Sequence, residues 1–231
     1  MRERCDLNNP KNKLIILILS GKNNISRRKV QQETWLKNIH IPYHFVLGGE
    51  EISQEPNVLW VDADDSELAQ KLLRAYKYLL KYDFDHIFTC DDDTYVVVER
   101  LLACGYEDHM YMGTRWEDHA EGGAGFFLNR ESIERFAQVP IDHPSLIGPS
   151  DVAIGNLAKM YTVYLHEDNR FIQGYSSKKK HGELPTPSND VITSHYITLQ
   201  LFKKIHSQFS HLYWKKILAQ DPKFQLAKAI L

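Results

Sequence analysis

Cysteine is scarce in this chain, which contains only Cys5, Cys90 and Cys104 among its 231 residues. An odd number of cysteines without paired spacing excludes a disulfide framework and a cysteine-based zinc site. Cys90 ends an apolar run, which favours a small buried side chain over a reactive thiol. The low count fits a reducing compartment.

The chain also lacks an excess of charge and any long apolar run. Its formal net charge of -2 gives no electrostatic basis for non-specific binding to nucleic acid. The first apolar stretch, Leu14–Leu19, is far too short to span a bilayer, and residues 1–10 contain no apolar run. We therefore expect no signal peptide and no membrane anchor. The start at Met1 favours a cytoplasmic protein over a chain that has lost a targeting segment.

The composition is ordinary for a soluble globular protein, with 43% hydrophobic and 25% charged residues. In the first half of the chain, short apolar runs alternate with stretches of helical periodicity. We expect strands at 14–19, 43–47, 58–61 and 86–90, and helices at 66–81 and at 27–38, the latter capped by Ser26. Continuous apolar strands are typical of a sheet covered on both faces. The pattern therefore predicts an α/β fold with a mainly parallel sheet.

The second half of the chain is less regular. We expect strands at 110–114 and 125–128, a helix at 131–137 capped by Asn129, and a helix at 151–160 capped by Ser150. Residues 173–190 are rich in Gly, Ser, Lys and Pro, which predicts an exposed loop. The tail, 207–231, predicts an amphipathic helix packed on the domain, with peripheral contact to a membrane surface as the alternative.

Three adjacent aspartates, Asp91, Asp92 and Asp93, directly follow the expected strand 86–90. In α/β sheets, ligands bind beyond the carboxyl ends of the strands, which is where this aspartate cluster lies. Adjacent carboxylates repel one another, and a divalent cation that prefers oxygen ligands would relieve the repulsion. The alternative is a solvated acidic turn, but the apolar residues on both sides of the cluster favour a metal site.

Other metal and phosphate sites fit this segment less well. An EF-hand loop needs alternating oxygen ligands and a central glycine, whereas Thr94, Tyr95 and Val96 follow the aspartates. A phosphoryl-transfer enzyme could use the same carboxylates, yet the chain has no Gly-x-x-x-x-Gly-Lys-Ser/Thr loop to hold phosphates. A metal-dependent phosphohydrolase or nucleotidyltransferase therefore remains as a rival interpretation.

Residues 90–96 resemble the Asp-x-Asp site of the fringe-like β1,3-glycosyltransferases, which include β1,3-galactosyltransferase-like members. Four further segments resemble the same family in the same order: Arg27-Arg28 with Thr34-Trp35, Gly122–Leu128, Pro149–Gly155 and Thr193–Tyr196. Together the matches cover about residues 14–206. Five matches in order are far more specific than one acidic cluster.

The resemblance implies a GT-A fold, in which a Rossmann-like mixed, mainly parallel sheet is flanked by helices in a single domain of residues 1–231. Its nucleotide-sugar half would be about 12–115, its acceptor and catalytic half about 116–206, and its helical tail 207–231. The implied activity is inverting, metal-dependent transfer of a sugar from a UDP-sugar to a hydroxyl of a glycan, glycolipid or glycoprotein. A non-catalytic carbohydrate-binding relative is the rival outside enzymes.

The resemblance also implies which residues hold the metal. Asp93 would be a direct ligand and His195 the ligand from a distant segment, with Asp91 or Asp92 facing the metal or the ribose. A neutral imidazole suits Mn²⁺ better than Mg²⁺, which is the weaker alternative. The metal would stabilise the charge that develops on the departing UDP. The structural alternative for His195 is a partly buried histidine whose hydrogen bonds are satisfied within the protein and that binds no metal.

Asp151 is implied as the general base of the reaction. An inverting transfer needs one carboxylate to take the proton of the acceptor hydroxyl while that oxygen attacks the anomeric carbon. The structural alternative is a carboxylate in the first turn of a helix, where the helix dipole favours negative charge.

The remaining implied contacts are to the nucleotide-sugar. An arginine would pair with the diphosphate, glycine-rich backbone would approach the ligand closely, and an aromatic ring would stack on a sugar. The residues concerned are Arg27, Arg28, Gly123, Ala124, Gly125 and Trp116. A solvated helix start, a glycine-rich turn and a core tryptophan are the structural alternatives.

Departures from the family pattern limit what the resemblance implies. Gln31 and Gln32 stand where animal galactosyltransferase-like members have apolar or basic residues, and Ser150 stands where an acidic residue is usual. The disulfide cysteines and membrane stem of secretory-pathway members are missing. We therefore expect a compact relative from a microbe or a virus-infected cell, or a soluble catalytic domain trimmed from a secretory-pathway enzyme. The resemblance names neither the sugar nor the acceptor.

Overall fold

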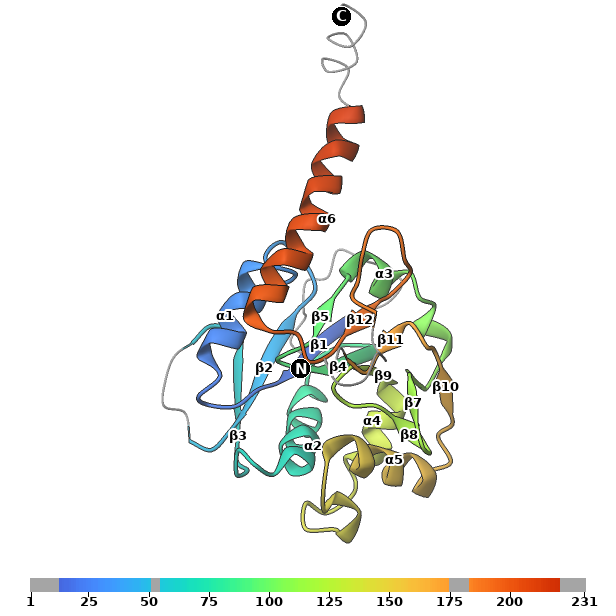
Figure 1. Cartoon of the computed structure of the whole chain (residues 1–231). Coiled ribbons are helices and arrows are strands. Elements are labelled where there is room, and N and C mark those ends of the chain that lie inside the picture. The colour runs from blue at the N-terminus through green and yellow to red at the C-terminus, as the bar shows by residue number, and fades with distance from the viewer. Residues whose placement is uncertain (1–12, 51–54, 175–182, 221–231) are drawn as a thin grey trace, which may run out of the picture.

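The computed structural model describes residues 13–50, 55–174 and 183–220, with side chains as far as Phe209. Cys5, part of the expected loop at 173–190 and the end of the expected tail lie outside the described residues. The described residues form a seven-stranded sheet that helices cover on both faces (Figure 1). The expected α/β fold with a mainly parallel sheet is therefore confirmed.

The main sheet has the strand order β10-β6-β9-β4-β1-β2-β3. Its strands are β1 (Leu14–Leu19), β2 (Tyr43–Gly48), β3 (Val58–Val61), β4 (His86–Asp91), β6 (Tyr111–Gly113), β9 (Phe126–Asn129) and β10 (Leu165–Glu167). Strands β3, β2, β1 and β4 run parallel to one another, and β9 lies antiparallel between β4 and β6. These four parallel strands end within one residue of their expected positions.

The apolar run of β1 shows why the strand lies at the centre of the sheet. All six of its side chains are buried, and they alternate between two apolar clusters, one on each face. Ile15 and Leu17 pack in the cluster that includes side chains of α2 (Leu68–Leu79), α4 (Arg130–Phe136) and α5 (Ser150–Met160). Ile16 and Ile18 pack in the cluster that includes side chains of α1 (Ile25–Glu33), α3 (Val98–Leu102) and α6 (Leu199–Gln220). Each such side chain contributes about 1.5–3 kcal/mol through burial.

Several short elements escape prediction from the sequence pattern. A small sheet joins β11 (Phe171–Ile172), β12 (Thr193–Ser194) and β5 (Tyr95–Val96), and a hairpin pairs β7 (Arg115–Trp116) with β8 (His119–Ala120). Strands of two residues are too short for period-two alternation to be visible. The small sheet nevertheless ties the segment after β4 to a segment almost a hundred residues later in the chain.

Two expected helix caps are wrong, and one is confirmed. Ser26 lies inside α1, because the helix begins at Ile25 after Asn24, whose side chain is drawn away to Asp92. Ser150 is the first residue of α5, since Pro149 takes the extended cap conformation before it. Asn129 does cap α4, and its side chain accepts a hydrogen bond from the backbone N–H of Ser132.

The expected tail helix is present but begins earlier, at Leu199 (Figure 1, red). Phe202 and Ile205 bury against the α1 side of the sheet, and Phe209 packs beside them. None of the described helices combines the length and the apolar character that crossing a bilayer requires. Phe202 and Ile205 precede the expected tail, and Phe209 is the residue of that tail whose packing the structure describes, so docking of the rest of the tail on the domain stays a prediction.

Candidate functional site

A cleft of about 310 Å³ opens at the carboxyl ends of β1 and β4. The aspartate cluster lines it, because β4 ends at Asp91 and the next two residues form the turn into β5. Backbone hydrogen bonds hold the turn to β1, with Asp92 N–H donating to the carbonyl of Leu19. The cluster therefore lies where an α/β sheet binds its ligands, as the sequence predicts.

Asp92 points into the protein and is fully engaged there. Its carboxylate accepts hydrogen bonds from Ser20 Oγ at 2.6 Å, Asn24 Nδ2 at 2.8 Å and Arg27 Nη1 at 2.8 Å. Ser20 and Asn24 lie in the segment that joins β1 to α1, and Arg27 lies in the first turn of α1. Asp92 therefore ties the start of α1 to the turn after β4.

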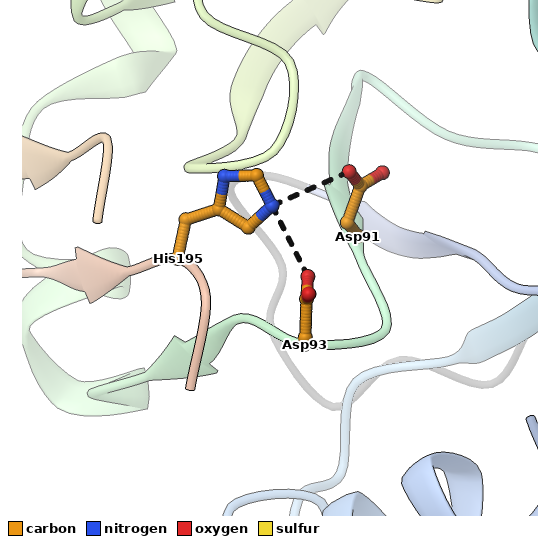
Figure 2. A group of neighbouring side chains, drawn as sticks. All are labelled: Asp91, Asp93 and His195. Atoms are coloured by element: carbon orange, nitrogen blue, oxygen red, sulfur yellow. Dashed lines mark ion pairs between the residues drawn. The ribbon is translucent and has the colours of Figure 1, made fainter. Parts of the chain in front are cut away.

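Asp91 and Asp93 point instead toward His195 (Figure 2). His195 Nε2 lies 3.1 Å from Oδ1 of Asp93 and 3.5 Å from Oδ2 of Asp91. His195 follows β12, so the small sheet brings it to the end of β4. One ligand atom from each of the three residues lies within 4.8 Å of the others, so the group could hold one metal ion.

The charges of this group compensate one another in the absence of a cation. Burial raises the pKa of Asp91 to about 7, and the neighbouring acidic groups act in the same direction while His195 opposes them. Burial lowers the pKa of His195, but the facing carboxylates of Asp93 and Glu121 outweigh it and raise that pKa to about 10. Burial raises the pKa of Asp93, but His195 and Arg27 outweigh it and hold that pKa below its usual value. The site attracts positive charge, whether a proton, a guanidinium or a metal ion.

Glu121 belongs to this group although the sequence argument missed it. The residue is buried, its Oε1 lies 3.4 Å from His195 Nδ1, and its Oε2 accepts a hydrogen bond of 2.5 Å from Ala124 N–H. The signal that could have identified Glu121 is its place in the sequence, as an acidic residue directly before the Gly-Gly-Ala-Gly segment.

The glycine loop, Gly122–Gly125, runs between the candidate catalytic groups. A Cβ at Gly123 would lie 1.8 Å from the ring of His195, and a Cβ at Gly122 would lie 2.9 Å from Cβ of Asp151. The first distance excludes any side chain at Gly123, and the second would force the Asp151 side chain to shift if Gly122 carried one. Ala124 is fully buried, and Gly125 packs against Phe88 in the core. The close approach that the glycine-rich segment makes is thus to protein side chains, and residues 122–125 are not among those that line the cleft.

Asp151 lies in the first turn of α5, against the glycine loop. Its Oδ2 accepts a hydrogen bond of 3.2 Å from Gly122 N–H and lies 3.8 Å from Nε2 of the buried His119. Its Oδ1 accepts from the N–H of Val152. The side chain remains 21% exposed, so the carboxylate is accessible from solvent while its position is fixed.

The two expected arginines occupy different surroundings. Arg27 is 43% exposed, lines the cleft and bridges Asp92 and Asp93, the latter at 3.4 Å. Arg28 is buried, where it pairs with Glu55 at 2.9 Å and donates to the carbonyl of Gly21. Arg27 is therefore available to a ligand, whereas Arg28 holds the segment after β1 in place.

Two aromatic side chains lie near the site with different degrees of exposure to the cleft. Trp116, in the β7–β8 hairpin, is 48% exposed but does not line the cleft. Tyr196, which the sequence argument did not single out, lines the cleft and stacks on His195 with ring centroids 3.8 Å apart. Its side chain is 56% exposed, so one face remains open.

The chain is similar in sequence to a curated galactosyltransferase. The chain matches no model of a known protein family. It is 26% identical over 171 residues to the glycoprotein-N-acetylgalactosamine 3-beta-galactosyltransferase 1 of Xenopus laevis, which covers 65% of this chain and 46% of the relative. The chain thus spans about half the length of the curated relative it matches.

Comparison with solved structures gives weaker likenesses. The galactosyltransferase LgtC, in complex with donor and acceptor sugar analogues, has a TM-score of 0.46 at 12% identity and covers 84% of this chain and 95% of its own. A glycosyltransferase involved in glycosylation of the major capsid of PBCV-1 has a TM-score of 0.48 at 14% identity and covers 82% and 99%. At these TM-scores the likeness carries no argument about function.

Proposed function

We propose that this protein is a metal-dependent glycosyltransferase that transfers a sugar from a UDP-sugar to a hydroxyl of a glycan, glycolipid or glycoprotein, with inversion. The observation that carries the proposal is the convergence of Asp91, Asp93 and His195 at one cleft, with Asp151 fixed against the adjoining glycine loop. The similarity to a galactosyltransferase supports the same class of reaction.

The residues present fit a divalent cation. Two carboxylates and one imidazole provide oxygen and nitrogen ligands within 4.8 Å of one another, a set that suits Mn²⁺ better than Mg²⁺. Asp91, Asp93 and His195 would hold the ion, which would supply positive charge to the diphosphate of the departing UDP. Without a cation, the same carboxylates would repel a diphosphate.

Arg27 is the protein group that we assign to the diphosphate. Its guanidinium is already in the cleft and is oriented by Asp92, whose other hydrogen bonds keep that carboxylate in place. Guanidinium groups bind phosphate through paired N–H donors. Arg28, the glycine loop and Trp116 complete the donor site in this proposal, Arg28 by shaping the segment after β1 rather than by contact.

Asp151 is the group that we assign to the proton transfer. Its carboxylate, held by Gly122 N–H and partly open to solvent, would accept the proton of the acceptor hydroxyl. In this proposal the two halves of the chain supply different groups. Residues 12–115 supply the aspartate cluster and Arg27, and residues 116–206 supply the glycine loop, Asp151 and His195. Asp151 also lies in the first turn of a helix, which is the structural alternative. A neutral substitution at this position separates the role of general base from that of a helix-start carboxylate.

A thermal-shift panel of UDP-, GDP- and dTDP-sugars, each with and without Mn²⁺, tests the donor and the metal together. A ligand at about 100 times its Kd stabilises the fold by about 2.7 kcal/mol, which corresponds to about 5–10 °C for a chain of this size. We expect that shift only with a UDP-sugar and Mn²⁺ together. Equal shifts without metal would contradict the proposal, and phosphate release without sugar transfer would indicate a phosphohydrolase instead.

A further inference from the structure

Glu121 faces His195, the metal ligand of the proposed function, and its role at the metal site rests on that function. The His195 ring is buried between two acidic groups: Nε2 faces Asp91 and Asp93, and Nδ1 faces Oε1 of Glu121 at 3.4 Å. Among the described residues, Nδ1 has no hydrogen bond of standard geometry, so the facing carboxylate of Glu121 is its electrostatic partner.

Glu121 is itself fixed by its surroundings. Its Oε2 accepts a hydrogen bond of 2.5 Å from Ala124 N–H, and its side chain is almost completely buried. The backbone of Gly123 presses on the His195 ring so closely that a Cβ would collide with it. The glycine loop therefore supports both the carboxylate and the ring, which restricts rotation of the imidazole.

A histidine can ligate a metal through either ring nitrogen, and the hydrogen bond made by the other nitrogen decides which one is used. A carboxylate facing Nδ1 favours a proton at that nitrogen, so Nε2 would be the nitrogen that binds a cation once its own proton is displaced. In this protein, Nε2 is the nitrogen that faces both aspartates.

We propose that Glu121 is a positioning residue for the metal site: it orients His195 so that Nε2 is directed at a divalent cation held by Asp91 and Asp93. Loss of such an outer carboxylate typically weakens metal affinity about 10- to 100-fold. The competing explanation is that Glu121 serves the loop alone, through its hydrogen bond with Ala124.

The first measurement is Mn²⁺ affinity, obtained from the electron paramagnetic resonance signal of free Mn²⁺ without any nucleotide. Glu121→Gln should raise the Kd for Mn²⁺ about 10- to 100-fold. A glutamine has one side-chain oxygen, which cannot accept from Ala124 N–H and from His195 Nδ1–H at the two positions that the carboxylate oxygens occupy. Glu117→Gln is the matched control, because Glu117 is exposed in the β7–β8 hairpin, and its Kd should stay within about twofold of wild type.

A double-mutant cycle with His195→Ala separates positioning from a general loss of negative charge or of loop structure. If Glu121 acts through His195, adding Glu121→Gln to His195→Ala should not weaken Mn²⁺ binding further. If the two effects instead multiply, Glu121 acts independently of the ring and the inference is overturned. Activity of Glu121→Gln should return when Mn²⁺ is raised above the new Kd, which a damaged loop would not allow.

Further outcomes separate this inference from the proposed function. Wild-type protein that binds no Mn²⁺ would remove both. Wild-type protein that binds Mn²⁺, together with a Glu121→Gln variant of equal affinity, would remove the positioning role and leave the proposed function standing. If Glu121→Gln does not fold, as judged by circular dichroism, Glu121→Asp replaces it: the carboxylate is kept but withdrawn from the ring, and the same loss of affinity is expected. Unchanged Mn²⁺ affinity in Glu121→Asp would also overturn the inference.

Discussion

One part of the site follows the end of β4, and the other part comes from short segments that pack against the glycine loop. Strand β4 pairs along its length with β1 and β9, so the main sheet fixes the positions of Asp91, Asp92 and Asp93. Asp151 and His195 instead depend on the first turn of a helix and the end of a two-residue strand.

The two sides also use different contacts. Asp92 is held by side-chain donors from one neighbouring segment, whereas Asp151 and Glu121 are held by backbone N–H groups of the glycine loop. A backbone donor survives most substitutions of its own side chain, but its position depends on the space that glycine leaves. The positions of the side chains on the β4 side should therefore depend mainly on charge, and the positions of those on the loop side mainly on the volume of the loop residues.

The largest effect is expected on the β4 side, from Asp93→Ala. The substitution removes a carboxylate that faces both His195 and Arg27, so metal-dependent binding of UDP should be abolished. The fold should survive, because the loss also relieves repulsion within the aspartate cluster. Calorimetric titration of UDP with Mn²⁺ measures binding, and circular dichroism checks the fold. A variant that binds both ligands like wild type would show that Asp93 is not a ligand.

The next effect is expected on the loop side, from Asp151→Asn. Asparagine retains the shape of the side chain and an oxygen for Gly122 N–H but cannot take up a proton. Sugar transfer should fall by about 10² to 10⁴, the usual contribution of a general base, while the affinities for UDP-sugar and Mn²⁺ stay nearly unchanged. The anomeric configuration of the product, read by NMR, should be β from an α-linked donor. Retention of the wild-type rate, or an α-linked product, would remove Asp151 from the mechanism.

A graded effect is expected from His195→Ala, since the two carboxylates of the metal group remain. The substitution should weaken Mn²⁺ binding but change the thermal stability of the metal-free protein little. Raising the Mn²⁺ concentration should therefore recover part of the rate. The measurement is the rate of transfer as a function of Mn²⁺ concentration. Unfolding of the variant, with no recovery at high Mn²⁺, would favour a purely structural histidine.

The smallest effect, and the most direct test of the comparison, is expected from Gly122→Ala. The new Cβ would lie 2.9 Å from Cβ of Asp151, so the carboxylate must shift. Because small displacements of a catalytic group reduce the rate steeply, transfer should fall about 10-fold while Mn²⁺ affinity remains that of wild type. In an Asp151→Asn background the same substitution should have little further effect on the rate. A loss of Mn²⁺ affinity instead would place Gly122 with the β4 side of the cleft.

The central strands and the aspartate cluster were predictable for a local physical reason. The apolar run of β1 is long enough to require cover on both faces, and the cluster directly follows a second such strand. Asn129 was also predictable as a helix cap, because its cap hydrogen bond, from the N–H of Ser132, is made within its own segment. Ser26 is not a cap because α1 begins one residue earlier, after Asn24, which is hydrogen-bonded to Asp92. Ser150 is not a cap because Pro149 takes that position before α5.

The sequence by itself determined the α/β sheet and the position of the aspartate cluster at a strand end, and its resemblance to a family suggested the candidate roles of Asp151 and His195. The tertiary structure alone decided which of these groups meet. Strand pairing between β12 and β5 brings His195 to Asp93, and packing of the glycine loop brings Glu121 to His195 and Gly122 to Asp151. The physical reason is range: hydrophobic periodicity and strand ends are local properties, whereas a contact between residues far apart depends on how the whole chain packs.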